Sequence, residues 1–477
     1  MLALLTIATL LLQMLFTSGP EKPTEALVPA DWKEVGQLKA RSAKEIKNST
    51  WSIGGETLDR DYTDYQAYKK YLGPLGATRI RLQGGWAKCE KVKGQYDFAW
   101  LDAVVDDALS QGIKPWIQTS YGNSIYEGGG EAALAGGIPT SEVALKAWDA
   151  WVAALVKHFN GRVTEWEIWN EPDLSKKFTA SQFARFHERT AGIIRQEQPK
   201  ARIIGLALCC TNWNEYADTV LTHLSKVNKK NLMDVVTFHG YALRPEDTYK
   251  RVEELQKVFA KHGMQVEYMQ GENGAPSTPK AITIGAMRER DWTELTQVKW
   301  DLRRMLGDHG RGISTNLFTI SDIHYAAGDH MEGVNSKGLL KTNPDKTIER
   351  PKIAYQAAQN IFSLFDNQLE RLPETKLKVN QENITTFGYE HTSGKGIVVT
   401  LWADEATPAE TYTPKTTTLT LTGTFKSPVF IDLISGKVYG IPKNDWKKEG
   451  STYTFTNIPV PDYPVAIAEK SILTLTK

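Results

Sequence analysis

Two glutamates stand where short apolar segments of the sequence end. Glu171 follows the segment 164–169, and Pro172 directly behind it stops a strand from continuing. Glu272 follows the segment 265–271 in the same way. Hydrolysis of a glycosidic bond needs two carboxyl groups, because one protonates the leaving oxygen while the other attacks the anomeric carbon or activates water. The pair is therefore the leading candidate for a catalytic centre.

The distance between the two carboxyl groups decides the stereochemistry of such a reaction. Carboxyl groups about 5 Å apart give retention of the anomeric configuration, and a wider separation leaves room for water and gives inversion. The residues alone leave both outcomes open, because the distance depends on the elements that carry the two side chains.

Those elements alternate regularly along the chain. From residue 51 to about residue 360, short apolar runs alternate with amphipathic stretches, as in a parallel sheet with crossover helices. The pattern predicts an α/β fold, a TIM (β/α)8 barrel over residues 50–362, in which catalytic residues lie where strands end. Glu171 and Glu272 end the fourth and seventh strands and so face each other across the barrel mouth. The strands are expected to begin at Trp51, Ala77, Lys114, Thr164, Arg202, Val235, Gln265 and Ser314.

The sequence changes character after about residue 363. Thr-rich alternating segments such as 396–402 and 416–422 replace the amphipathic stretches and are separated by turn residues. We expect a C-terminal antiparallel β-sandwich over residues 363–477. This accessory domain either braces the barrel, which we favour, or binds sugar.

The chain begins with an apolar run. Residues 1–16 have the length of a signal-peptide core and precede small and polar residues, so residues 1–19 are predicted to be a signal peptide. Residues 20–49 then form an N-terminal linker, and the mature protein is secreted or periplasmic. An uncleaved N-terminal anchor is the alternative, because the run lacks the usual leading Lys or Arg.

Charge and cysteine content narrow the classes of partner. The sequence holds 57 Lys and Arg against 56 Asp and Glu, so a net charge of +1 gives no field to draw nucleic acid or an anionic membrane. Cys89, Cys209 and Cys210 are its cysteines, and the adjacent pair does not meet the usual geometry of a disulfide. No phosphate-binding glycine motif precedes a helix, so no cofactor is expected. The expected partner is a carbohydrate, which the 10% aromatic content suits.

The motif Trp169-Asn170-Glu171-Pro172, with a glutamate after the seventh strand, resembles the signature of glycoside hydrolase clan A. Within that clan the chain is most similar to family 39, the β-xylosidase and α-iduronidase group, over about residues 50–360. The resemblance implies a retaining glycosidase that works by double displacement. It assigns Glu171 as acid/base, Glu272 as nucleophile and Asn170 as a partner of the substrate's 2-hydroxyl.

Arg81, near the end of the second strand, resembles the arginine that keeps the clan's nucleophile ionised. An adjacent positive charge lowers the pKa of a carboxyl group. The alternative is a structural network inside the barrel, in which Arg79 and Arg81 pair with Glu165 or Glu167.

His239 and Tyr241 follow the sixth strand and resemble the clan's His-x-Tyr. In that motif the Tyr hydroxyl binds the nucleophile and the His reaches the active site. The alternative is that both are core residues with satisfied hydrogen bonds.

Aromatic and polar residues near strand ends are candidates for contacts with sugar. Tyr121 and Asn123 follow the third strand and suit hydrogen bonds to hydroxyl groups, although Asn123 equally suits loop structure. Several tryptophans near the mouth either form platforms for sugar rings or fill the core, and these are Trp86, Trp116, Trp169, Trp213 and Trp292.

The sequence departs from the clan pattern after the eighth strand, where residues 318–325 lack the tryptophan that many members carry. Asp322, His324, Asp329 and His330 lie in and beyond this segment and are of types that bind metals. Because the first strand offers no His-x-His, no catalytic metal is expected.

Two other functions would use the same residues. A carbohydrate-binding pseudoenzyme would keep the barrel and its aromatic residues without turnover, although it has no need of two glutamates at the mouth. A transglycosidase would form the same intermediate and deliver it to a sugar hydroxyl instead of water.

Overall fold

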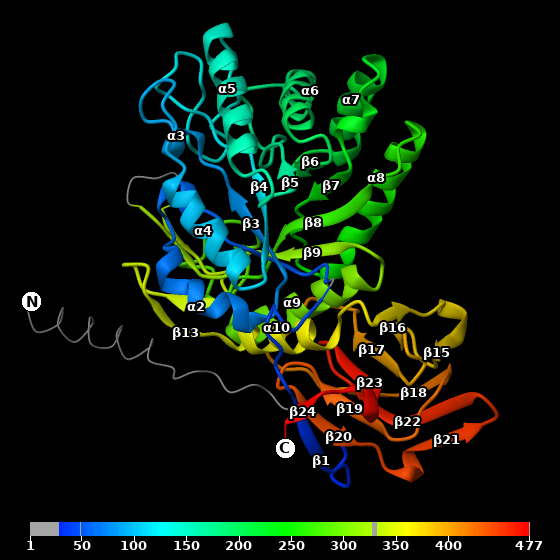
Figure 1. The fold of residues 1–477 in the computed structure, drawn as a ribbon. Coiled ribbons are helices and arrows are strands. Elements are labelled where there is room, and N and C mark those ends of the chain that lie inside the picture. The colour runs from blue at the N-terminus through cyan, green and yellow to red at the C-terminus, as the bar shows by residue number, and fades with distance from the viewer. Residues whose placement is uncertain (1–27, 48, 327–331, 477) are drawn as a thin grey trace, which may run out of the picture.

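The computed structural model describes residues 28–476, apart from residue 48 and residues 327–331. It contains a closed eight-stranded barrel followed by antiparallel sheets (Figure 1). The predicted fold class is confirmed. The predicted signal peptide, residues 1–19, lies outside the described residues. No helix in the described part of the chain is long and apolar enough to span a bilayer.

The barrel strands follow one another in sequence order, and all neighbouring pairs are parallel. Each begins within two residues of its predicted start, because strands buried on both faces appear in sequence as apolar runs. The strands are β2 (Ser52–Gly54), β3 (Arg79–Gln83), β4 (Lys114–Gln118), β5 (Glu165–Glu167), β6 (Arg202–Leu208), β7 (Val235–Phe238), β8 (Glu267–Asn273) and β9 (Ser314–Leu317).

A helix follows each barrel strand and lies on the outside of the barrel (Figure 1). Local sequence fixes where these helices begin: at the start of α6 the Thr179 and Gln182 side chains each bind the other's backbone N–H group. The helices are α2 (Tyr65–Leu75), α4 (Ala99–Ser110), α5 (Glu142–His158), α6 (Ala180–Glu197), α7 (Trp213–Lys226), α8 (Tyr249–Lys261), α9 (Glu294–His309) and α10 (Ile353–Leu364), with the short α3 (Trp86–Cys89) before α4.

Two small hairpins follow β9, and the first of them contributes to the wall of the cavity at the barrel mouth. They pair β10 (Ile323–Tyr325) with β11 (Gly333–Asn335), and β12 (Leu340–Thr342) with β13 (Ile348–Pro351).

Two antiparallel sheets form the C-terminal domain together with the N-terminal strand β1 (Glu34–Leu38), with the strand orders β14-β16-β17-β23-β19-β20-β1-β24 and β15-β18-β22-β21. Apolar and polar residues alternate along strands such as β18, as the sequence predicts. The C-terminal strands are β14 (Leu369–Arg371), β15 (Leu377–Val379), β16 (Ile384–His391), β17 (Ile397–Ala403), β18 (Lys415–Thr422), β19 (Pro428–Asp432), β20 (Lys437–Gly440), β21 (Trp446–Glu449), β22 (Thr452–Val460), β23 (Val465–Glu469) and β24 (Leu475–Thr476).

The N-terminal segment is more than the linker expected for residues 20–49. Residues Glu34–Leu38 form β1, which pairs with both β20 and β24 of the C-terminal domain. Figure 1 shows this blue strand among the red and orange ones. The expectation of a linker is wrong for these residues, because a five-residue strand whose partners lie at the other end of the chain leaves little local signal.

Polar side chains connect the barrel to the C-terminal domain. The fully buried Arg303 of α9 donates from Nε to Glu246 Oε1 at 3.0 Å, and Trp402 Nε1 of β17 donates to the same oxygen at 2.9 Å. Lys299 Nζ lies 2.8 Å from Asp462 Oδ1. These buried contacts tie the β domain to the barrel on the side of α9.

Candidate active site

A cavity of about 770 Å³ lies at the C-terminal ends of the barrel strands. Its volume is in the range of small-molecule sites, about 300–1,000 Å³. Both predicted catalytic residues, Glu171 and Glu272, line it. The loops after several strands and the hairpin of β10 and β11 complete its wall.

The two glutamates reach the cavity from different local structures. Glu272 lies near the end of β8, whereas Glu171 follows β5 with a left-handed backbone of φ +46°. The N–H group of Leu174 donates to the Glu171 carbonyl at 3.0 Å and holds this turn. Non-glycine residues in this conformation cost about 1–3 kcal/mol and cluster at functional sites.

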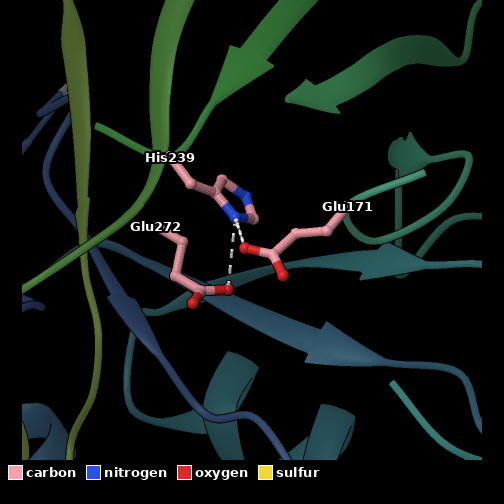
Figure 2. A group of neighbouring side chains, drawn as sticks. All are labelled: Glu171, His239 and Glu272. Atoms are coloured by element: carbon pink, nitrogen blue, oxygen red, sulfur yellow. Dashed lines mark hydrogen bonds and ion pairs between the residues drawn. The ribbon is translucent and has the colours of Figure 1, made fainter. Parts of the chain in front are cut away.

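The carboxyl groups of Glu171 and Glu272 point toward each other (Figure 2). One oxygen of each lies within 4.8 Å of one oxygen of the other. This separation is close to the roughly 5 Å that characterises retaining glycosidases and is too short for the water of an inverting one.

His239, directly after β7, lies beside both carboxyl groups. Its Nδ1 is 2.7 Å from Glu171 Oε1 and 3.7 Å from Glu272 Oε2 (Figure 2). The ring is buried, and its Nε2 has no hydrogen-bond partner within the described chain. The predicted His therefore lies in the site and contacts the residue expected to be the acid.

Arg81 of β3 is fully buried beneath Glu272. Its Nη1 lies 3.0 Å from Glu272 Oε2, and its Nη2 donates to Asn170 Oδ1 at 2.8 Å. Its Nε and Nη2 also donate to Glu167 Oε2, at 2.9 and 2.7 Å. Arg81 thus makes both of its predicted contacts, with Glu272 in the cavity and with Glu167 inside the barrel. Arg79 pairs with Glu165 and makes only the structural contact.

Burial and charge move the pKa values of the two glutamates apart. Burial raises the pKa of Glu171, against the opposing hydrogen bond from His239. Burial would also raise the pKa of Glu272, but the charges of His239 and Arg81 and the hydrogen bonds from Tyr241 and Arg81 outweigh it and hold that pKa below its usual range. The site can therefore hold one protonated and one ionised carboxyl group at the same pH.

Three other predicted residues also line the cavity. Tyr241 OH donates to Glu272 Oε1 at 2.9 Å, as the clan resemblance implies. Asn170 donates from Nδ2 to Tyr121 OH at 3.0 Å, and both of these side chains lie in the cavity wall beside Glu171.

Trp86, Trp169 and Asn123 do not line the cavity, so their positions support the alternatives of core packing for the tryptophans and loop structure for Asn123 over contact with sugar. Trp86 stacks on Trp151 in the core at a ring distance of 6.0 Å, and Trp169 packs edge-on against Phe186. Asn123 is buried and donates to the Glu90 carbonyl at 2.8 Å. The remaining tryptophans considered, Trp116, Trp213 and Trp292, are likewise buried outside the cavity wall.

Aromatic residues other than tryptophan line the cavity instead. Phe318 and Tyr325, in the segment that lacks the clan's tryptophan, join Tyr121 and Tyr241 in the wall. Their rings offer the apolar faces that the tryptophans were expected to provide.

Sequence reasoning missed several charged residues of the cavity wall, and Glu56 and Lys337 are two of them. Glu56 follows β2 and lies 3.3 Å from Arg81 Nη1, and burial raises its pKa to about 7. Lys337 follows β11 and donates to Asn335 Oδ1 at 3.1 Å, and burial lowers its pKa to about 8. The position of Glu56 just after the first barrel strand could have indicated a site residue, whereas the sequence around Lys337 contains no such indication.

The residues considered as metal ligands after β9 have other partners. Asp322 Oδ1 lies 2.6 Å from Lys352 Nζ, and His324 Nε2 lies 3.0 Å from the Thr342 carbonyl oxygen. Asp329 and His330 lie outside the described residues.

Among the described residues, one group has the residue types and spacing of metal ligands, namely Glu171, His239 and Glu272. The Arg81 guanidinium, 3.0 Å from Glu272, already places a positive charge where a cation would bind. The charges around the three side chains therefore disfavour a metal.

The adjacent cysteines form a disulfide, contrary to the sequence-based expectation. Cys209 and Cys210 follow β6 and are joined through sulfur, with a Cα–Cα distance of 3.7 Å. The expectation rested on the Cα–Cα distance of about 4.4–6.8 Å that is usual for disulfides between cysteines farther apart in sequence. Both residues line the cavity, and Cys89 is a buried free thiol.

Residues 82–274 match the family described as glycosyl hydrolases family 39. The matched segment contains Glu171, His239 and Glu272. A β-xylosidase of Geobacillus stearothermophilus is 27% identical over 188 residues, 34% of this chain and 37% of the relative. A β-xylosidase of Caldicellulosiruptor saccharolyticus is 26% identical over 130 residues, 25% of this chain and 26% of the relative. The matches thus span well under half the length of these relatives.

Solved structures resemble the chain over most of its length. A family 39 glycoside hydrolase from Bacteroides cellulosilyticus has a TM-score of 0.59 at 19% identity, covering 89% of this chain and 81% of that one. A β-xylosidase from Caulobacter crescentus has a TM-score of 0.58 at 14% identity, covering 91% and 97%. At these identities the likeness concerns the fold, a barrel followed by β-sheets.

Proposed function

Because the barrel of this chain belongs to glycoside hydrolase family 39, we propose that the protein is a retaining glycosidase that works by double displacement. The observation that carries the proposal is the approach of Glu171 and Glu272, whose oxygens come within 4.8 Å of each other. Carboxyl groups this close leave room for a covalent intermediate but not for an interposed water.

In the first step, Glu272 attacks the anomeric carbon while Glu171 donates its proton to the leaving oxygen. Arg81 and Tyr241 suit this step, because both favour the ionised form of Glu272 before it attacks. In the second step, Glu171 takes a proton from the water that attacks the anomeric carbon, and the bond to Glu272 breaks. Glu171 then carries the proton needed for the next cycle.

The sugar we propose is β-linked xylose. Two relatives that match parts of this chain are named β-xylosidases, which supports a β-xyloside as the first substrate to test. The open cavity, with Tyr121, Tyr241, Phe318 and Tyr325 in its wall, suits a sugar with apolar ring faces.

The deciding experiment uses the full chain with aryl β-xyloside as substrate and other aryl glycosides and polysaccharides in parallel. Proton NMR of the first-formed sugar should show the β-anomer, before mutarotation, if configuration is retained. Glu272→Gln should abolish turnover, and Glu171→Gln should slow it about 10²–10⁴-fold. Glu267→Gln is the matched control, because Glu267 begins the same strand and lies outside the cavity wall. First-formed α-xylose would overturn the retaining mechanism.

Two alternatives give different results in the same assay. A carbohydrate-binding pseudoenzyme would bind xylosides with no turnover in the wild type. A transglycosidase would give longer oligosaccharides in place of free xylose at high acceptor concentration. The two close carboxyl groups favour turnover over binding alone. The acceptor experiment measures how much of the intermediate is transferred to water and how much to a sugar hydroxyl.

We also propose that the protein is exported to the cell surface, the periplasm or the medium. The apolar residues 1–16 support this proposal, and so does the Cys209–Cys210 disulfide, because disulfides persist in oxidising compartments. Fractionation with N-terminal sequencing of the recovered protein tests it. A protein that retains Met1 in the cytoplasm would contradict export.

A further inference from the structure

The Cys209–Cys210 disulfide closes a small ring in the wall of the cavity. Cys209 is half-buried and Cys210 is exposed, so the cavity has access to the ring. The bonded sulfur atoms carry no hydrogen and are polarisable, so the ring behaves as apolar surface. The two-glutamate mechanism gives the ring no chemical role.

Asp173 holds the backbone of the ring. The N–H groups of Cys209, Cys210 and Thr211 donate to its carboxylate at 3.0, 2.8 and 2.9 Å. Asp173 is itself buried, 6% exposed, which makes these charge-assisted hydrogen bonds a fixed support. Because the three N–H groups already donate to Asp173, they are not available to a ligand. The surface that the ring presents to the cavity therefore consists of carbon and sulfur atoms, without backbone donors.

The ring lies on the side of the cavity where the leaving group must sit. Asp173 is two residues beyond Glu171, and Leu174, next in the chain, lines the same wall. The acid must contact the leaving oxygen, so the group attached to that oxygen extends past Glu171. The ring and Leu174 together form an apolar surface next to this position.

We propose that the Cys209–Cys210 ring is a contact surface of the leaving-group subsite, on which the apolar face of the departing sugar or aromatic group packs. This inference rests on the proposed glycosidase function. It makes the ring a determinant of which leaving groups the enzyme accepts. The contact requires the covalent ring, because two separate thiols are free to rotate out of the wall.

Three xylosides separate contact from acid catalysis. Xylobiose has a sugar leaving group that needs both the subsite and the proton of Glu171. 2,4-Dinitrophenyl β-xyloside fills the subsite but leaves as a stable anion without a proton. β-Xylosyl fluoride needs neither. The ratio of kcat/KM for the dinitrophenyl xyloside to kcat/KM for the fluoride therefore reports the contact alone, and xylobiose adds the contribution of the acid.

The test compares the wild type with a C209A/C210A double variant. We expect kcat/KM to fall about tenfold for xylobiose and for the dinitrophenyl xyloside. A tenfold fall is at the low end of the range expected when an apolar contact is lost. The value for the fluoride should stay unchanged. Cys89→Ala is the matched control, because it removes a cysteine buried away from the cavity wall.

Reduction of the folded wild type by a phosphine gives the same test without a substitution. The phosphine takes oxygen from water while the disulfide becomes two thiols, and the double variant treated in parallel reports any other effect of the reagent. We expect the same tenfold pattern in the reduced wild type.

Other patterns overturn the assignment. If kcat/KM is unchanged for all three substrates, the ring makes no contact with the leaving group. A fall for xylobiose alone would mean an effect through Glu171, and an equal fall for all three substrates would mean a general structural role. A wild type that is active on all three and shows one of these patterns refutes the subsite alone. A wild type inactive on all three refutes the proposed function and this inference with it.

Discussion

Arg81 Nη1 lies 3.0 Å from Glu272 Oε2 while the other side of the same guanidinium binds Glu167. One buried cation therefore joins a carboxylate inside the barrel to the carboxylate in the cavity. Glu167 is itself fixed by Gln118 Nε2 at 2.8 Å and by Thr237 Oγ1 at 2.7 Å. The barrel interior thus orients the charge that keeps Glu272 ionised.

Replacing Arg81 by Gln should move the acidic limb of the kcat/KM profile to higher pH. In the proposed mechanism Glu272 must be ionised to attack, so activity is expected to be lost as pH falls through its pKa. Arg81 lowers that pKa, and removing its charge raises the pKa toward the ordinary value or above it. The pH dependence of kcat/KM, which reports the free enzyme, measures the shift.

The same variant should unfold more easily, by about 3–5 kcal/mol, because Glu167 is left as a buried charge without its partner. Arg79→Gln is the control: Arg79 precedes Arg81 by two residues on the same strand but pairs with Glu165. That variant should lose stability and keep the wild-type acidic limb. Superimposable acidic limbs for Arg81→Gln and wild type would contradict the role given to Arg81.

Replacing His239 by Asn should move both limbs of the profile to higher pH. The charge of His239 lowers the pKa of Glu272, and its hydrogen bond lowers the pKa of Glu171. Without it both pKa values rise, so Glu272 becomes protonated at higher pH and Glu171 also keeps its proton to higher pH. The active range shifts upward as a whole.

The control for this variant is His187→Asn. His187 is buried on α6, contacts the Leu232 carbonyl oxygen at 3.0 Å and lies outside the cavity wall. Its loss should leave both limbs in place. A His239→Asn profile in which only one limb moves would show that His239 acts on one of the two glutamates alone.

Tyr241→Phe should lower kcat/KM about 10- to 100-fold and leave the fold intact. The phenol donates to Glu272 Oε1 at 2.9 Å, and a hydrogen bond to a charged group contributes about 1.5–3 kcal/mol. Tyr249→Phe is the matched control, since its buried hydroxyl has no hydrogen-bond partner in the described chain. Equal kcat/KM values for Tyr241→Phe and wild type would remove Tyr241 from the catalytic site.

The barrel and the positions of both glutamates could be predicted because their signals are local. Apolar runs mark strands buried on both faces, and a glutamate just after such a run must lie at the barrel mouth. The directions of neighbouring side chains could not be predicted in the same way. Glu171 has a left-handed backbone, φ +46°, so the alternation of strand faces does not extend through the loop. Trp169 consequently packs in the core although it lies two residues from Glu171.

The residues that sequence reasoning missed depend on contacts between distant segments. Lys337 reaches the cavity from the segment between β11 and β12, beyond the last barrel strand, and β1 pairs with strands at the other end of the chain. Asn123 was a candidate for contact with sugar because the sequence does not indicate its hydrogen bond to the Glu90 carbonyl. In each case burial by a remote segment, and not residue type, decides the role.

The C-terminal domain is expected to brace the barrel through buried polar contacts. Glu246 accepts hydrogen bonds from Arg303 of α9 and Trp402 of β17, and Arg303 is fully buried. Glu246→Ala should reduce the free energy of unfolding by about 3–5 kcal/mol, because the Arg303 charge loses its partner. Denaturant unfolding measures this, with the exposed Glu215→Ala as control. The folded variant should keep its kcat/KM on aryl xyloside, since Glu246 lies outside the cavity wall. A variant with wild-type stability and weakened binding to polysaccharide would favour the sugar-binding role of the domain instead.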